Sequence, residues 1–357
     1  MLDQPQSGRR ALLATLSGLL AGMRAGRSLA GVPPTVALPF SENPKLLVAG
    51  PADGALNRWA DALLPALEQS LPPDTAIRRI EIGSTDGVTG ANQFEARGAP
   101  DGHTVLLTPG YAALAWMVGD PRAQFDVGGW VPVMAGTSAA IVVGRAPVLG
   151  AQGRARVAAA GPASCDLAAL LGVHLLGVPF EPLFGLIEAN AAQGAFAQGA
   201  ADVVLLRGPR VPERFAALAS AGAQPLFSLG ALDDSGLVTR DPTFPEVPHF
   251  AELYAARMGA TPSGLLYDGW RACAAAARLE FGLVLPQLTP ASMVALWRRA
   301  GIDAAASLGV RATAATVDVQ PLAGPAATAN TAAVAASAPV LRELRTWLAS
   351  RFNWRPA

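Results

Sequence analysis

The stretch Lys45–Asn57 reads KLLVAGPADGALN and joins a short apolar run to a glycine-bearing turn and the start of a helix. Leu46–Ala49 shows no polar alternation, which is typical of a strand buried on both faces in a parallel sheet. The turn Gly50–Gly54 follows at once. A helical pattern then places apolar residues on one face, before Pro72-Pro73 ends it: Leu56, Trp59, Leu63, Leu64, Leu67 and Leu71. The free N–H groups at this helix start predict an anion site at the carboxyl edge of a sheet.

Two further units repeat the order of strand, small-residue loop and helix. The second predicted strand covers residues 77–82 and leads into the loop 83–90, with a helix from about Ala91 towards Arg97. The third covers residues 103–108, after the turn signal APDG, and leads into Pro109-Gly110. In an open α/β sheet such loops line up along one crevice, where ligands bind.

Residues 130–134 form a further expected strand, and a second set of units then predicts a second sheet, with a second row of loops opposite the first. The expected strands after 130–134 are 139–143, 157–160, 178–180, 202–206 and 225–229, and the expected helices are 167–175, 186–198 and 211–221. Strands 139–143 and 225–229 are the expected crossings between two lobes. Beyond about residue 232 the pattern indicates loop and then helices at 249–258, 290–300 and 338–351, while residues 309–338 fit no clear pattern.

The composition excludes some classes of partner. The chain has 357 residues, enough for two domains, and only 15% of them are charged, with a formal net charge of zero. Because no surplus of Lys and Arg is available to neutralise phosphates, we expect no nucleic-acid partner.

The N-terminal segment has the order of an export signal. Arg9-Arg10 precede an apolar run over residues 11–23, which at about 13 residues suits a signal-peptide core and is too short to span a bilayer. Ser28-Leu29-Ala30 offers a cleavage site. We expect residues 1–30 to be a signal peptide, of Sec or twin-arginine type, residues 31–43 a Pro-rich leader, and the mature protein periplasmic. The alternative is a disordered N-terminal arm that contains no targeting signal.

The cysteines and histidines do not form a reactive site. Cys165 and Cys273 have no metal-type spacing, and we expect two free, buried thiols rather than a bridge that would lock a hinge. Cys165 lies at a predicted helix start, where a thiol pKa can fall, but a nucleophile needs a base. His103, His174 and His249 are scattered along the chain. The sequence therefore predicts no enzyme, no metal site and no cofactor.

Several stretches together resemble the extracytoplasmic solute receptors of the tripartite tricarboxylate transporter family, the Bug receptors. The family's first loop reads like PFxxGG, and Gly50–Asn57 stands in its place. Its glycine-rich second loop is matched by Glu81–Asn92. Ala99–Leu107, APDGHTVLL, is similar to the family's PDGYTLL. Phe125–Val133 resembles its YDP…FxPV segment, and Asp241–Pro248 its LPDVPT turn. The likeness covers most of residues 44–350 in order and spacing.

The resemblance implies an α/β fold of the two-lobed periplasmic binding protein kind (type II, Venus-flytrap), with an open mixed sheet in each lobe and a cleft between them. Lobe one would be residues 44–138 plus 232–357, and lobe two residues 139–231. It implies a monomeric receptor that captures a small carboxylate or related metabolite for a tripartite-type membrane permease. Family members hold the ligand carboxylate mainly through backbone N–H groups and waters. The alternatives are a sensory receptor without a permease and a divergent member that binds little.

The chain departs from the family pattern at four places. Asp53 replaces a glycine of the first loop, Thr85-Asp86 interrupts the second, and His103 stands where the family has tyrosine. Arg207 stands where an acidic residue is common. A loop carboxylate that faced the cleft would repel an anion, so the ligand could be a neutral amide. Alternatively, Asp53 and Asp86 cap the helices that follow them.

The predicted ligand-binding residues lie in the loops at the strand ends. They are Pro51, Ala52, Asp53, Gly54, Ala55, Ser84, Thr85, Asp86, Gly87, Thr108, Gly110, Pro162, Ala163, Ser164, Cys165 and Arg207. Arg207 is the sharpest of these predictions, because a guanidinium at a strand end can hold a carboxylate in a fork. The alternatives for Arg207 are a salt bridge with a neighbouring carboxylate or a solvated position.

Overall fold

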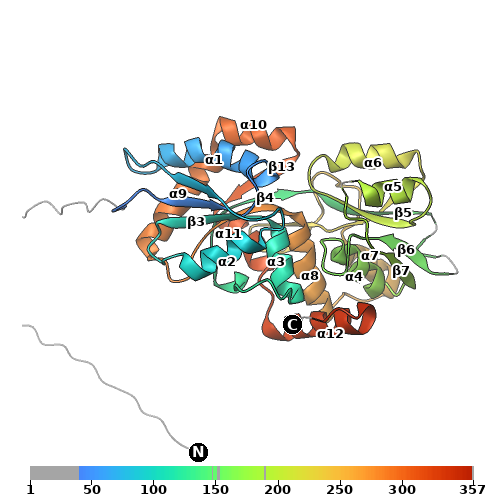
Figure 1. The fold of residues 1–357 in the computed structure, drawn as a ribbon. Coiled ribbons are helices and arrows are strands. Elements are labelled where there is room, and N and C mark those ends of the chain that lie inside the picture. The colour runs from blue at the N-terminus through green and yellow to red at the C-terminus, as the bar shows by residue number, and fades with distance from the viewer. Residues whose placement is uncertain (1–39, 147, 151–152, 189, 356–357) are drawn as a thin grey trace, which may run out of the picture. The chain divides into compact units, whose positions relative to one another are not determined.

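The computed structural model describes residues 40–146, 148–150, 153–188 and 190–355, which belong to one compact unit. Helices surround two open sheets, both of mixed strand direction (Figure 1). The predicted signal peptide, residues 1–30, lies outside the described residues, and so does most of the predicted leader. Among the described residues, no helix is both long and apolar enough to cross a membrane.

The larger sheet has the strand order β13-β4-β12-β3-β1-β2. Its strands are β1 (Lys45–Val48), β2 (Arg78–Glu81), β3 (Thr104–Thr108), β4 (Val131–Ser138), β12 (Leu279–Leu285) and β13 (Val319–Ala323). Strand β1 pairs in parallel with β2 and β3, whereas β12 runs antiparallel to β3 and β4. The carboxyl ends of β1, β2 and β3 therefore lie at one edge, as the sequence predicts, together with the start of β12.

The smaller sheet has the strand order β7-β6-β8-β5-β9. Its strands are β5 (Ala140–Arg145), β6 (Ala155–Ala158), β7 (Phe180–Leu183), β8 (Val203–Arg207) and β9 (Ala223–Ser228). A separate two-stranded hairpin joins β10 (Ala231–Leu232) and β11 (Val238–Thr239). We call the larger sheet with its helices the first lobe, and the smaller sheet with its helices the second lobe.

One chain segment passes directly from the larger sheet to the smaller. Strand β4 ends at Ser138 and β5 begins at Ala140, so only Ala139 separates them. The return runs through β9, where Leu229 N donates to Ala140 O at 2.9 Å. In β8, Arg207 pairs with Ala140, which places the end of β8 beside the crossing. Both predicted strands are present, as β5 and β9.

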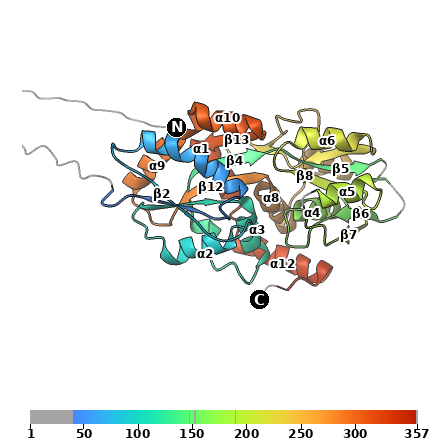
Figure 2. The ribbon, with the colours of Figure 1, turned by 45° about the horizontal axis from the view of Figure 1, so that its top comes forward.

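The helices of the first lobe are α1 (Ala55–Ser70), α2 (Val88–Arg97), α3 (Gly110–Val118), α8 (Leu265–Arg278), α9 (Ala291–Ala306), α10 (Leu308–Thr316), α11 (Gly324–Ala333) and α12 (Ala338–Phe352), with a 3₁₀ turn at Val127–Gly129. Helix α1 packs against α9 and α10, while α8 packs against α3 and α12 (Figures 1 and 2). The side chains of α1 buried in this packing include the predicted Leu56, Trp59, Leu63 and Leu67.

The second lobe carries α4 (Leu167–Leu175), α5 (Ala191–Ala197) and α6 (Val211–Ala219), and α7 (Phe250–Met258) packs beside β9. Helix α8 of the first lobe also packs against α4 of the second. Trp270 of α8 is 1% exposed, and its Nε1 donates to Ala168 O at 2.9 Å. The two lobes therefore share a buried contact in addition to the crossing strands.

One secondary-structure prediction is wrong in extent, and one segment was not predicted. The predicted helix 186–198 is shortened to α5, because Asn190 adopts a left-handed conformation with φ of 69° immediately before its first turn. The segment between residues 258 and 290, for which the sequence predicted neither helix nor strand, contains α8 and β12. Strand β12 lies in the middle of the larger sheet, between β4 and β3, so the prediction lacked a central strand.

Candidate functional site

A cavity of about 160 Å³ lies where the predicted loops of the first lobe meet the end of β8. Its walls come from the end of β1 and the turn after it, the starts of α1 and α3, and the junction of α8 with β12. The lining residues are Ala49, Gly50, Pro51, Gly54, Ala55, Leu56, Thr85, Pro109, Gly110, Tyr111, Arg207, Ala276, Leu279 and Glu280. The volume is that of roughly five water molecules, which suits a short-chain ligand.

Two helix N-termini open onto this cavity without a side-chain cap. Gly54 precedes α1 and Pro109 precedes α3, and neither makes a side-chain capping hydrogen bond. Within the described residues, the N–H groups of the first two residues of each helix have no backbone partner: Ala55, Leu56, Gly110 and Tyr111. All four residues line the cavity. These donors and the two helix dipoles make the first-lobe wall a site for an anionic group.

The first loop is held in place from beneath by Asn57. This buried side chain, 2% exposed, donates through Nδ2 to Pro51 O, and Gly54 N donates to the same carbonyl at 2.9 Å. The second loop is fixed by Asp86, whose Oδ1 accepts from Val88 N at 3.2 Å and whose Oδ2 pairs with Arg122 at 2.8 Å. The loop geometry is therefore set before any ligand arrives.

Arg207 is the second lobe's contribution to the cavity. Its side chain is only partly buried, and among the described residues it forms no ion pair and no side-chain hydrogen bond. Its guanidinium nitrogens are not among the fully buried atoms that lack a hydrogen-bond partner. The titratable groups near it are Cys165, Asp166, Glu280 and Tyr111. A free guanidinium in a confined space offers a fork of N–H donors to a carboxylate.

Tyr111, in the first turn of α3, is a lining residue that the sequence did not single out. Burial raises the pKa of its phenol to about 12, so the hydroxyl stays protonated and can donate. No hydrogen bond to this hydroxyl forms within the described residues, and the group is not sealed off. Its position directly after Pro109-Gly110 could have indicated it from the sequence, because a residue there lies in the first turn of the helix that follows the loop.

Glu280, the second residue of β12, is the other lining residue that sequence reasoning missed. Ser138 Oγ donates to Glu280 Oε1 at 2.8 Å and accepts from Gly208 N at 3.2 Å. Burial raises the pKa of the Glu280 carboxyl. One charged residue inside the apolar run Leu279–Leu285 was the available signal. The three residues connect β12, the end of β4 and the loop after β8.

The structure brings six of the sixteen predicted binding residues to the cavity: Pro51, Gly54, Ala55, Thr85, Gly110 and Arg207. Ala52, Asp53 and Ser84 are exposed beside it, and Asp86 and Gly87 hold the second loop behind it. Asp53 makes no capping bond to α1, so that expectation is wrong, whereas Asp86 accepts a first-turn N–H of α2 as expected. Thr108 lies at the end of β3, but its hydroxyl is buried and has no hydrogen-bond partner among the described residues.

The loop 161–166 of the second lobe does not reach the cavity wall. Ser164 Oγ donates to Gly161 O at 2.8 Å and to Asp166 Oδ2 at 3.0 Å, so its hydroxyl holds the loop itself together. Cys165 is 2% exposed, and burial raises the pKa of its thiol. Pro162 and Ala163 are only partly buried and are absent from the lining. Both cysteines are free and buried, as predicted.

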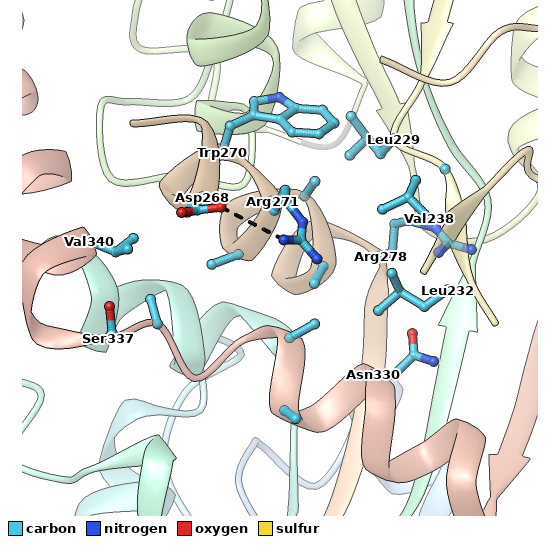
Figure 3. A pocket seen from close by; sticks show the side chains of 17 residues that line it. Leu229, Leu232, Val238, Asp268, Trp270, Arg271, Arg278, Asn330, Ser337 and Val340 are labelled. Atoms are coloured by element: carbon cyan, nitrogen blue, oxygen red, sulfur yellow. Dashed lines mark ion pairs between the residues drawn. The ribbon is translucent and has the colours of Figure 1, made fainter. Parts of the chain in front are cut away.

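A larger cavity, of about 380 Å³, lies between α8, α11 and the β10–β11 hairpin (Figure 3). Its walls are mainly apolar and alanine-rich. Two of its charged side chains pair at the edge, Asp268 with Arg271 at 3.7 Å, and Arg278 pairs with Asp241 at 3.4 Å. Leu229 and Gly230, which follow β9, and Ser337, which precedes α12 without a side-chain cap, also line it. Each charged side chain in its wall has an ion-pair partner, whereas Arg207 in the smaller cavity has none among the described residues. We therefore take the smaller cavity as the candidate ligand site.

No group of His, Cys, Asp and Glu suited to a metal ion occurs among the described residues. His103 Nε2 lies 3.1 Å from Ser41 N, and His249 completes a capping box with Glu252 at the start of α7. Burial lowers the pKa of His174, which packs on Trp347. Each histidine thus contacts a different structural partner, and the three histidines lie far apart in the sequence.

Comparisons with known proteins connect this fold to one class. No model of a protein family matches the chain, and no curated protein sequence matches it. Among solved structures, it is similar to a TctC solute-binding protein from Polaromonas without ligand, with a TM-score of 0.64, 18% identity, and coverage of 88% of this chain and 98% of that one. A structure described as a periplasmic transporter has a TM-score of 0.50, 16% identity, and coverage of 89% and 99%. R. palustris Rpa4515 with adipate also has a TM-score of 0.50 and 16% identity, with coverage of 86% and 98%.

The chain thus has an α/β, two-lobed periplasmic binding fold with an open mixed sheet in each lobe, as the sequence predicted. Within that class, the chain is similar to the TctC type of solute-binding protein, which confirms the predicted resemblance at the level of the fold. Two of the similar structures named above are described as a solute-binding protein and a periplasmic transporter.

Proposed function

We propose that this chain is a periplasmic solute-binding receptor that captures a small carboxylate between its two lobes. The observation that carries the proposal is Arg207, a cation without an ion-pair partner among the described residues, in a cavity where two uncapped helix N-termini meet. One such feature alone has many explanations. Together, three positive elements aimed into one small space favour an anion of matching size.

The proposed mechanism divides the work between the lobes. The first lobe supplies backbone N–H groups at the starts of α1 and α3 and the Tyr111 hydroxyl. The second lobe supplies Arg207. A carboxylate bound between them contacts both lobes at once, so ligand binding favours the closed arrangement and excludes water from the hydrogen bonds. These groups bind and hold the ligand, and we propose no catalysis.

Delivery to a tripartite-type membrane permease and export through the N-terminal segment complete the proposal. Both are supported by the family resemblance and by the similarity to a TctC protein. The adipate bound to Rpa4515 supports a carboxylate as the ligand class. A monomer with one ligand per chain is the state that this mechanism requires.

The test is a thermal-shift screen of the mature protein against small carboxylates and their amides, followed by calorimetry. Arg207→Ala should weaken binding of the best carboxylate by at least tenfold, roughly 1.4 kcal/mol. Arg58→Ala is the matched control, because Arg58 is an exposed arginine of α1 outside the cavity. Equal affinity of wild type and Arg207→Ala, or a screen won by an amide that does not need Arg207, would refute the proposal.

A further inference from the structure

Glu280 places a negative charge in the same cavity as Arg207. Both residues line the space of about 160 Å³, yet no salt bridge joins them within the described residues. An arginine and a glutamate so close in a partly buried space would normally pair, because each pays a desolvation cost. Here the two charges are held apart and open to the cavity between them.

The Glu280 carboxylate is anchored on one side only. Its Oε1 accepts from Ser138 Oγ at 2.8 Å, and that hydroxyl accepts in turn from Gly208 N at 3.2 Å. No hydrogen bond reaches Oε2 within the described residues, and Oε2 is not among the sealed atoms. One oxygen is therefore fixed by Ser138 at the end of β4, and the other remains available to a ligand donor.

The surroundings act on the Glu280 carboxyl in both directions. Burial raises its pKa, whereas the hydrogen bond with the Ser138 hydroxyl and the charges of Arg207 and Arg214 favour the charged form. Arg214 itself is occupied, since it donates to Arg207 O. A cationic ligand group beside Oε2 would favour ionisation further.

From this pair of separated opposite charges we infer that the cavity selects a small zwitterion. The ligand's carboxylate faces Arg207, Tyr111 and the helix starts, and its ammonium group faces Glu280. This inference rests on the proposed function and specifies its substrate class. A dicarboxylate of the same length would set its second negative charge against Glu280, so Glu280 acts as the specificity-determining residue.

The experiment compares three probes that share a four-carbon chain: 4-aminobutanoate, butanedioate and butanoate. Shorter amino acids, glycine and 3-aminopropanoate, extend the series to the size of the cavity. We expect calorimetry on the wild type to give the tightest binding for one of the amino acids, at least tenfold tighter than butanedioate. Glu280→Gln keeps the shape and the Ser138 contact but removes the charge, so it should weaken the amino acid at least tenfold and strengthen butanedioate.

Three controls make the result decisive. Glu343→Gln on the exposed face of α12 should leave all affinities unchanged. Glu280→Asp should retain the preference for a zwitterion if the charge matters, and the melting temperature of each variant shows whether it folds. Affinities measured at two pH values test the opposite case. In that case a protonated Glu280 donates to the second carboxylate of the ligand, and butanedioate binds more tightly as the pH falls.

The outcomes distinguish this inference from the proposed function. If butanedioate or butanoate binds best through Arg207, and Glu280→Gln changes no preference, the zwitterion inference is wrong while the carboxylate receptor stands. If no carboxylate probe or screened carboxylate binds at all, both are wrong. A preference that reverses in Glu280→Gln and persists in Glu343→Gln supports the inference.

Discussion

Replacing Trp270 by phenylalanine should loosen the contact through which α8 of the first lobe holds α4 of the second. The indole is 1% exposed, and its ring centroid lies 4.1 Å from that of Phe250. Its Nε1 donates to Ala168 O at 2.9 Å. Phenylalanine keeps most of the aromatic packing, but it removes this donor and part of the ring.

The magnitude follows from these two losses. A buried hydrogen bond contributes about 0.5–1.5 kcal/mol, and a partial truncation of a buried ring costs about 1 kcal/mol more. The local opening of α4 from α8 should then be about 2 kcal/mol easier, which is a factor of roughly 30 in the population of the open form. Amide hydrogen exchange reports that population directly, without a ligand.

The matched control is Trp297→Phe. Trp297 is 0% exposed, and its Nε1 donates to Gly102 O at 2.8 Å, but both residues belong to the first lobe. We expect similar losses in melting temperature for the two variants. Faster exchange in α4 should appear only in Trp270→Phe. Unchanged exchange in α4, or equal acceleration in both variants, would refute the view that Trp270 couples the lobes.

Two further predictions concern the cavity wall and the pH dependence of stability. Gly110→Ala should destabilise the fold by about 2 kcal/mol or more in a denaturant titration, because its Cβ would lie 2.1 Å from Ala276 O and 2.8 Å from Leu279 O. The control is Gly194→Ala in α5, where nothing lies within 4 Å of the new Cβ, and it should not lower the stability. An equal loss of stability in the two variants would contradict the clash. Asp202→Asn should lower the melting temperature by about 1–3 °C at pH 7, because the hydrogen bond from Arg156 lowers the pKa of Asp202 and so stabilises the fold above the ordinary aspartate pKa. That stabilisation is lost as the pH falls through the lowered pKa, so the difference between wild type and variant should close in acid; a difference that persisted there would exclude this charge as its cause.

The sequence predicted the first-lobe loops because their signals are local. A buried strand, a glycine turn and an amphipathic helix each leave a pattern within about 15 residues, and Lys45–Ser70 contains all three. The same reasoning placed β3 and the start of α3. In a parallel sheet the carboxyl ends share an edge, so finding the strands was enough to bring Gly54 and Gly110 to one cavity.

Ser164 and Cys165, predicted as ligand-binding residues, do not line the cavity, and no local pattern in the sequence indicates this. Their loop also follows a strand and precedes a helix, but Asp166 and Ser164 form hydrogen bonds with its own backbone. Whether a loop reaches a cleft depends on where the two lobes meet. That relation is set by long-range contacts such as Trp270 with Ala168, which sequence spacing does not encode.

Glu280 was missed because its strand was missed. The run Phe281–Leu285 is apolar and ends before Pro286, which is a strand pattern, but the alanine-rich helix α8 before it weakened the contrast between elements. Strand β12 pairs with strands about 145 and 175 residues earlier in the chain. Such distant pairing is visible only in the folded sheet.

The departures from the family pattern gain a physical meaning from this arrangement. Asp53 and Asp86 are the two loop carboxylates expected to repel an anion. Asp53 is exposed to solvent and Asp86 pairs with Arg122, and neither residue lines the cavity. The charges that do face the cavity, Arg207 and Glu280, come from β8 and β12, one from each sheet. The backbone N–H groups of the first lobe suit any carboxylate, whereas discrimination requires charges. The proposal therefore assigns the choice of ligand to these two strand ends rather than to the glycine-bearing loops.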